Sequence, residues 1–227
     1  GEAAVENCAA ALCTGEPAML LLGGRALRAP TLEIAGRIAA HSNAAIRSEL
    51  MSARTERGAG RVTVERIPYV VDQAVKVLEG IRHLILVGAK APVAFFAYPN
   101  KPSLLIPQNC EIHVLATAEE DIADGLERLC DSIGAQSTSP NLELAKRPDL
   151  SSGELTLEAL WAAVGHLLPE DAIVSDESIT SGRGLHSFIR GCPPHDWLAG
   201  TGGAIGRALP EATGAAVACP DRPVLCL

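Results

Sequence analysis

Polar side chains that could hold a phosphate group follow a short apolar stretch late in the chain. Residues 172–175 are predicted to form a buried strand, and the segment from Ser175 to Gly182 is rich in hydroxyl and carboxyl groups. Parallel sheets bind their ligands at the carboxyl ends of the strands, where such hydroxyls can donate hydrogen bonds to a diphosphate. The same residue types dominate turns and helix amino termini, so a capped turn without a ligand explains the segment equally well.

A glycine-rich segment comes shortly afterwards. Four glycines fall within residues 200–206, and backbone without side chains allows a flat ligand to lie against it. Pro210 suits the first turn of a following helix, because its missing N–H group would have no partner there in any case. A purely structural turn is the alternative interpretation.

Two further patterns could carry chemistry. Gly23 and Gly24 follow a predicted strand, where backbone amides could approach a phosphate. The full G-x-G-x-x-G pattern is absent, however, and no clear acidic residue follows a second strand to bind a ribose. Cys192 and His195, with His186 nearby, have the spacing of two zinc ligands, yet no second ligand pair accompanies them. A dinucleotide site and a zinc site therefore remain weaker alternatives.

Predicted strands alternate with predicted helices along the chain, and these elements must position the segments described above. The alternation predicts a parallel sheet covered on both faces, that is, a Rossmann-like α/β domain over residues 1–136. Residues 137–154 are predicted to be a linker, and residues 155–227 to begin a second α/β domain. Polar residues 51–66 are predicted as a surface loop, and Thr31 as a helix cap. The predicted strands are 18–22, 44–50, 83–87, 104–106, 112–115, 172–175 and 224–227, and the predicted helices are 2–14, 31–40, 69–79, 119–133, 156–168 and 210–218.

Composition restricts the partners of this protein. The formal net charge is −8 and there is no basic run, which argues against nucleic acid. The seven cysteines form no C-x-x-C pair, which indicates free thiols in a reducing cytosol. The apolar runs are too short to span a bilayer. We therefore expect a cytoplasmic protein without a nucleic-acid or membrane partner.

The order of these parts resembles one family. The hydroxyl-rich segment, the glycine-rich segment, the pattern G-x-x-L-P-x-A-x-G-A from Gly206 to Ala215 and the strand before Leu227 resemble the sequence that leads into the metal motif of thiamine-diphosphate-dependent enzymes. Residues 53–61 and 86–96 resemble the central domain of the members related to acetolactate synthase and benzoylformate decarboxylase. The expected fold is a Rossmann-like central domain followed by a truncated thiamine-diphosphate-binding domain.

This resemblance implies a cofactor site. Thr180 is the best candidate for a direct hydroxyl contact with the cofactor diphosphate, and Ile205 would support the bent form of the cofactor. Gly203 and Ala204 would offer backbone to its aminopyrimidine ring. The implied enzyme uses thiamine diphosphate and Mg²⁺ to decarboxylate or join 2-oxo acids. The residues implied to contact the cofactor are Glu177, Ser178, Ile179, Thr180, Gly203, Ala204 and Ile205.

The resemblance also implies what this chain lacks. The family's activating Glu lies in an amino-terminal domain that is absent here. The Mg²⁺ ligands are expected beyond Leu227, where a Gly-Asp-Gly motif would follow. No catalytic residue is therefore expected within the chain, and the chain alone is expected to be inactive.

Three functions remain open at this point. The leading one is a fragment of a thiamine-diphosphate-dependent enzyme that forms a homo-oligomer, a dimer or a tetramer by analogy. The second is a stand-alone nucleotide-binding module for FAD or NAD. The Gly23–Gly24 pair does not decide whether the central domain holds a flavin nucleotide, and FAD is the less expected cofactor. The third is a non-catalytic oligomerisation scaffold.

Overall fold

The computed structural model describes all 227 residues, and they form two compact units. Unit 1 comprises residues 1–50 and 64–141, and unit 2 comprises residues 51–63 and 142–227. The chain therefore leaves unit 1 for a short excursion into unit 2, returns, and enters unit 2 again. None of the helices is both long and apolar enough to traverse a bilayer.

Unit 1 is built on a five-stranded sheet with the strand order β4-β2-β1-β5-β6. All neighbouring strands are parallel, and the direction of winding reverses between β1 and β5, as in doubly wound Rossmann-like sheets. The α/β fold predicted from the sequence is thereby confirmed. The elements are α1 (Glu2–Cys13), β1 (Ala18–Leu22), η1 (Gly24–Leu27), α2 (Ala29–Ser42), β2 (Ala45–Ser48), β4 (Glu65–Arg66), α3 (Val71–Leu78), β5 (His83–Val87), β6 (Glu111–Ala116) and α4 (Ile122–Ser132).

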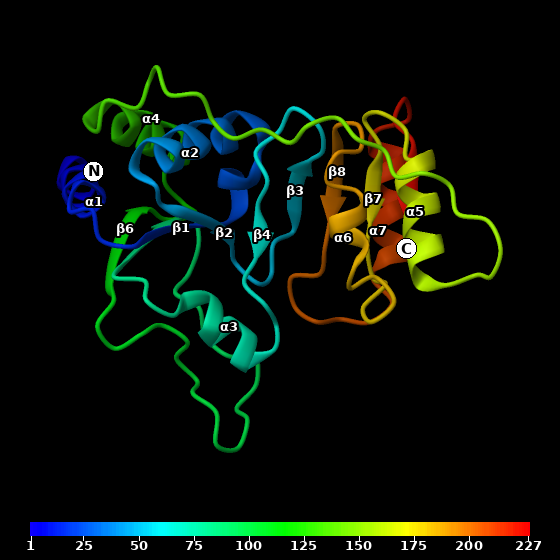
Figure 1. Cartoon of the computed structure of the whole chain (residues 1–227), viewed down its shortest axis with the longest axis horizontal. Helices are drawn as coiled ribbons and strands as arrows, with labels where there is room; N and C mark the ends of the chain where they lie inside the picture. The colour runs from blue at the N-terminus through cyan, green and yellow to red at the C-terminus, as the bar shows by residue number, and fades with distance from the viewer. The chain divides into compact units, whose positions relative to one another are not determined.

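Burial explains the composition of the central strands. Every residue of β1 and β5 is buried, so these strands are almost uniformly apolar rather than alternating. Figure 1 shows α1, α2 and α4 on one face of this sheet and α3 on the other. On the α3 face, Leu21 and Leu84 belong to the same core cluster as Leu78. The sheet of unit 1 is therefore covered on both sides.

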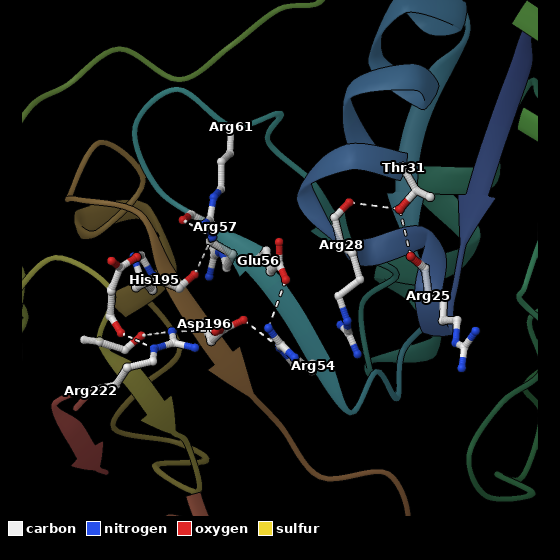
Figure 2. A network of polar contacts seen from close by, with 12 residues as sticks. Arg25, Arg28, Thr31, Arg54, Glu56, Arg57, Arg61, His195, Asp196 and Arg222 are labelled. Atoms are coloured by element: carbon white, nitrogen blue, oxygen red, sulfur yellow. Dashed lines mark hydrogen bonds and ion pairs between the residues drawn. The ribbon is translucent and has the colours of Figure 1, made fainter. Parts of the chain in front are cut away.

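Two local predictions for unit 1 are wrong. Residues 104–106 do not form a strand, since Leu104 makes only an isolated bridge with Val93. Thr31 does not cap a helix, because α2 already begins at Ala29 with Pro30 in its first turn. The hydroxyl of Thr31 lies 2.7 Å from the carbonyl oxygen of Arg25 and 2.9 Å from that of Arg28, and it donates to this pair (Figure 2).

Unit 2 has a four-stranded sheet with the order β3-β8-β7-β9. Strand β7 is parallel to both β8 and β9, whereas β3 is antiparallel to β8. The elements are β3 (Arg54–Arg57), α5 (Leu157–Leu167), β7 (Ile173–Ser175), α6 (Leu185–Phe188), β8 (His195–Leu198), α7 (Ala208–Ala218) and β9 (Val224–Cys226). Thr156 caps α5 by accepting a hydrogen bond from the amide of Ala159.

The predicted surface loop 51–66 is wrong in its middle, where residues 54–57 form β3, and at its end, where residues 65–66 form β4. The edge strand β3 pairs with β8 in the register Arg54 with Leu198 and Arg57 with His195. Val62 makes a further bridge to Leu142, also within unit 2. The polar composition of β3 concealed the strand, because its charged side chains find partners in unit 2.

A buried carboxylate holds β3 in place (Figure 2). Asp196 is 3% exposed, and its two oxygens accept hydrogen bonds from Arg54 at 2.7 Å and from Arg222 at 2.6 Å. Burial alone would raise the pKa of Asp196, but these two guanidinium groups outweigh it and hold the pKa below its usual value. The side chain of Arg57 lies over the ring of Trp197 at 5.7 Å from the centroid.

Candidate functional site

The loops that follow β7 and β8 form the candidate site at the carboxyl edge of the unit 2 sheet. Since β7 and β8 are parallel neighbours, their carboxyl ends lie side by side. The amide of Asp176, directly after β7, donates to the carbonyl of Leu198 at 3.0 Å. The amide of Glu177 donates to the carbonyl of Leu227 at 2.8 Å, after the third parallel strand. The hydroxyl-rich and glycine-rich segments therefore meet at one edge.

Glu177 joins the two loops. Its carboxylate accepts a hydrogen bond from the amide of Ala208 at 2.9 Å and another, very short one from the amide of Gly206. These backbone donors lower the pKa of Glu177, so the group is ionised at neutral pH. The negative charge lies at the amino terminus of α7, where the helix dipole favours an anion. Glu177 therefore fixes the position of the glycine-rich loop relative to β7.

Arg207 reinforces the same junction. Its guanidinium group donates to the backbone carbonyl of Asp176 and forms an ion pair with Glu211 one helical turn later. Ser175, completely buried at the end of β7, donates to the same carboxylate oxygen of Glu211 at 2.6 Å. Two loops and the first turn of α7 are thus tied into one polar network.

Besides Glu177, the loop after β7 presents three of the predicted cofactor contacts. Ser178 donates its hydroxyl to Asp176, which shapes the turn. Ile179 has a φ of 43°, a left-handed conformation that a β-branched side chain rarely adopts, and its side chain is 64% exposed. Thr180 follows and is also exposed. Strained backbone of this kind gathers at ligand sites, where surrounding structure maintains it.

The glycine-rich loop presents the other three. Gly203 and Ala204 are exposed, and Gly203 has a φ of 70°. Ile205 is 87% exposed, an unusual position for a large aliphatic side chain. A Cβ atom added at Gly202 or Gly206 would meet nothing within 4 Å, so the backbone here borders open space. The loop thus presents bare backbone beside one exposed aliphatic side chain, and its contact with a flat ring stays a prediction.

Helix α5 supports the loop after β7 from the side. The indole nitrogen of Trp161 donates to the carbonyl of Ser181 at 2.6 Å. A Cβ atom at Gly184 would lie only 2.2 Å from the Trp161 ring, so a glycine is required there. Sequence reasoning missed Trp161 as well as Arg207, because both act through contacts that are distant along the chain.

Cys192 and His195, the candidate zinc ligands, make hydrogen bonds to backbone carbonyls instead. The thiol of Cys192 is buried and donates to the carbonyl of Gly165 at 3.1 Å. His195 is fully buried, and its Nδ1 lies 2.8 Å from the carbonyl of Pro193, which assigns the proton to Nδ1. Its Nε2 has no hydrogen-bond partner, and burial lowers the pKa of this imidazole to about 4. Both residues therefore belong to the interior of unit 2.

The nucleotide alternative concerns the edge of unit 1 between β1 and β5. Gly23 and Gly88 end these strands, and the amide of Gly23 donates to Val87 at 2.9 Å. A Cβ atom at Gly23 would lie 2.5 Å from the carbonyl oxygen of Gly88 and 2.7 Å from the Glu49 carboxylate. The tight packing of the two strand ends accounts for these glycines without any ligand.

Glu49 corrects one sequence interpretation. It directly follows β2 and is therefore the acidic residue at a second strand end that we did not identify. Burial raises the pKa of Glu49, while the backbone amide and the charge of Lys90 oppose that rise. The carboxylate is thus already engaged by Lys90 and provides little support for ribose binding.

Comparisons with known proteins find relatives that match nearly the whole chain. No protein-family model matches the chain. A Mycobacterium tuberculosis protein, provisionally named acetolactate synthase large subunit IlvX, is 49% identical over 219 residues, which is 96% of this chain and 42% of that protein. The chain therefore spans less than half the length of this curated relative.

Solved structures share the fold over nearly the whole chain. The thiamine diphosphate-dependent 4-hydroxybenzoylformate decarboxylase of Rhodococcus jostii RHA1 superposes with a TM-score of 0.72 at 21% identity, covering 98% of this chain and 45% of that one. A Mycobacterium smegmatis protein, provisionally described as thiamin diphosphate-dependent, gives a TM-score of 0.67 at 18% identity, with coverages of 97% and 47%.

Proposed function

Because this chain is homologous to acetolactate synthase large-subunit-like proteins and has the fold of thiamine-diphosphate-dependent enzymes, we propose that it forms the central part of such an enzyme and the beginning of its cofactor-binding domain. The proposed substrates of the complete protein are 2-oxo acids, which it would decarboxylate or join to a second carbonyl compound. Mg²⁺, a homo-oligomeric state and a cytoplasmic location are parts of the same proposal.

One observation carries the proposal beyond homology. The residues that the resemblance implied, although about 25 positions apart, come from two loops that Glu177 ties together at the carboxyl ends of two parallel strands. That edge offers hydroxyls, open backbone and an exposed aliphatic side chain. These are the groups that a cofactor with a diphosphate and two flat rings requires.

Each group has a proposed task. Thr180 would donate its hydroxyl to the diphosphate, whereas Ser178, whose hydroxyl donates to Asp176, would shape the loop around it. Gly203 and Ala204 would face the aminopyrimidine ring. Ile205 would pack between the two rings of the cofactor. When bound, thiamine diphosphate would supply the carbanion chemistry, while these residues supply binding and orientation. Glu177 acts by positioning, since its carboxylate already accepts two backbone hydrogen bonds.

The test uses the complete product of the gene, with thiamine-diphosphate binding measured by calorimetry and turnover measured with pyruvate and benzoylformate. Thr180→Val and Ile205→Ala are each expected to weaken cofactor binding about tenfold, the effect of one lost hydrogen bond or apolar contact. Thr213→Val is the matched control, because the Thr213 hydroxyl donates only to Leu209 within α7. Turnover that does not depend on thiamine diphosphate would contradict the proposal.

The isolated 227-residue chain is expected to show no turnover. Tight binding of FAD or NAD by this chain, lost on Glu49→Gln, would instead favour a nucleotide-binding module. Oligomerisation without binding of thiamine diphosphate or a nucleotide would favour a scaffold.

A further inference from the structure

Two histidines and a glutamate lie together at the amino ends of β5 and β6. This edge of the unit 1 sheet is opposite the edge where Gly23 and Gly88 end β1 and β5. His83 opens β5, while Glu111 and His113 lie two residues apart on β6. Alternate residues of a strand share a face, and His83 is in register with Glu111 on the neighbouring strand. The pairing of two parallel strands therefore brings all three side chains to one face.

The geometry of this cluster suits a metal ion. Nδ1 of His83 lies 3.1 Å from Nε2 of His113, and Oε2 of Glu111 lies 3.8 Å from the first and 3.9 Å from the second. A point equidistant from these three atoms lies about 2.1 Å from each, close to the length of zinc–nitrogen and zinc–oxygen bonds. Two imidazoles and one carboxylate are also a ligand set that zinc favours.

A second carboxylate prepares His83 for coordination. Oε2 of Glu16 lies 3.2 Å from Nε2 of His83, on the side of the ring that faces away from the cluster. This contact places the ring proton on Nε2 and leaves the lone pair of Nδ1 directed at His113 and Glu111. Histidines that bind metals are oriented in this way, with the other ring nitrogen donating to a carboxylate.

The cluster is also accessible from one side. The side chains of His83 and His113 are only 8% and 16% exposed, whereas that of Glu111 is 72% exposed. The imidazoles are thus held by the fold, and the carboxylate can close on an arriving ion. Without an ion, the ring of His113 donates from Nε2 to His83, and binding would release that proton or move it to Nδ1.

We propose that His83, His113 and Glu111 bind one divalent transition-metal ion of the zinc type, with water completing its coordination. The site is separate from the proposed cofactor site, because it belongs to unit 1 and to the amino ends of its strands. Its proposed role is to join β5 and β6 at that edge.

The test uses the 227-residue chain after chelation, titrated by calorimetry with Zn²⁺ and by absorption spectroscopy with Co²⁺. We expect one ion per chain and visible Co²⁺ bands typical of four-coordinate nitrogen and oxygen ligands. Loss of the carboxylate that orients His83, in Glu16→Gln, is expected to weaken binding about tenfold or more. His113→Ala and Glu111→Gln are expected to weaken it further, and His41→Ala, in the same unit but outside the cluster, is the matched control.

Several outcomes would overturn the inference. One is the absence of stoichiometric binding. Another is a near-ultraviolet thiolate band, which would assign the ion to cysteines instead. A third is binding that persists in both His113→Ala and Glu111→Gln. Glu111 is largely exposed, so its variant keeps the test valid if the histidine variant fails to fold.

Discussion

The two units differ in how completely their sheets are buried. In unit 1 the two central strands, β1 and β5, are buried at every position and lie between helices on both faces. In unit 2 only β7 is buried throughout, and every residue of β9 is partly accessible. The difference shows that unit 1 is stabilised mainly by apolar burial, whereas unit 2 relies more on polar contacts between distant segments.

Helices of unit 2 show the same contrast. Leu167 of α5 is 67% exposed, and Leu209 and Val217 of α7 are 72% and 79% exposed. An apolar groove of about 430 Å³ lies between α5 and β9, lined by residues that include Leu160, Val164 and Leu225. Helices α5 and α7 of unit 2 therefore leave large apolar side chains exposed, although loops of unit 1 also expose some, such as Leu104 at 71%.

A matched pair of core substitutions tests this contrast most strongly. Leu20→Ala in β1 removes a completely buried side chain and is expected to lower the free energy of unfolding of unit 1 by about 4 kcal/mol. Leu225→Ala in β9 removes a partly exposed one and should cost about 1–2 kcal/mol in unit 2. Urea denaturation followed by circular dichroism measures both. Equal losses would mean that β9 is as well covered as β1.

Removing the central carboxylate of unit 2 tests its polar anchor. Asp196→Ala leaves Arg54 and Arg222 without their shared buried partner, and we expect it to destabilise unit 2 by about 3 kcal/mol. Glu65→Gln is the control, because it breaks an exposed ion pair with Arg47 that should contribute less than about 1 kcal/mol. Trp161 and Trp197 both lie in unit 2, so tryptophan fluorescence reports its unfolding. Comparable effects of the two substitutions would remove the distinction between anchor and surface pair.

Acid should weaken unit 2 through His195. Its pKa falls from 6.5 to about 4 on folding, because the imidazole is buried. The unfolded chain therefore takes up a proton below pH 6.5 while the folded chain does not, so stability is complete above pH 6.5 and declines toward pH 4. We expect a loss on the order of 2–3 kcal/mol across this interval. Thermal unfolding at pH 7 and pH 4.5 measures it, and His195→Gln should flatten the dependence.

The sequence predicted what depends on local pattern. Continuous apolar runs identified β1 and β5, because strands covered on both faces carry few polar residues. Strand β8, with the sequence His-Asp-Trp-Leu, was not identified. Its aspartate is acceptable in the interior because Arg54, 142 positions away, and Arg222, 26 positions away, donate hydrogen bonds to it, and no local pattern reveals such partners.

The candidate site divides in the same way. Hydroxyls after a strand and glycines before a helix could be placed at a sheet edge from local order alone. The contact of Glu177 with the glycine-rich loop could not be predicted, because it depends on where the amides of Gly206 and Ala208 lie after folding. The cluster of His83, Glu111 and His113 likewise required the register of β5 and β6.

Because residues 51–63 belong to unit 2, the strands of the unit 2 sheet come from two segments that are far apart along the chain. A single cut in the exposed segment near residue 152 would leave β3 on the amino-terminal fragment while β8 stays on the other. The two fragments would share one sheet and would remain associated until denaturant separates the strands. Ribosomal synthesis meets the same constraint, since β3 emerges long before its only strand partner and must wait for it.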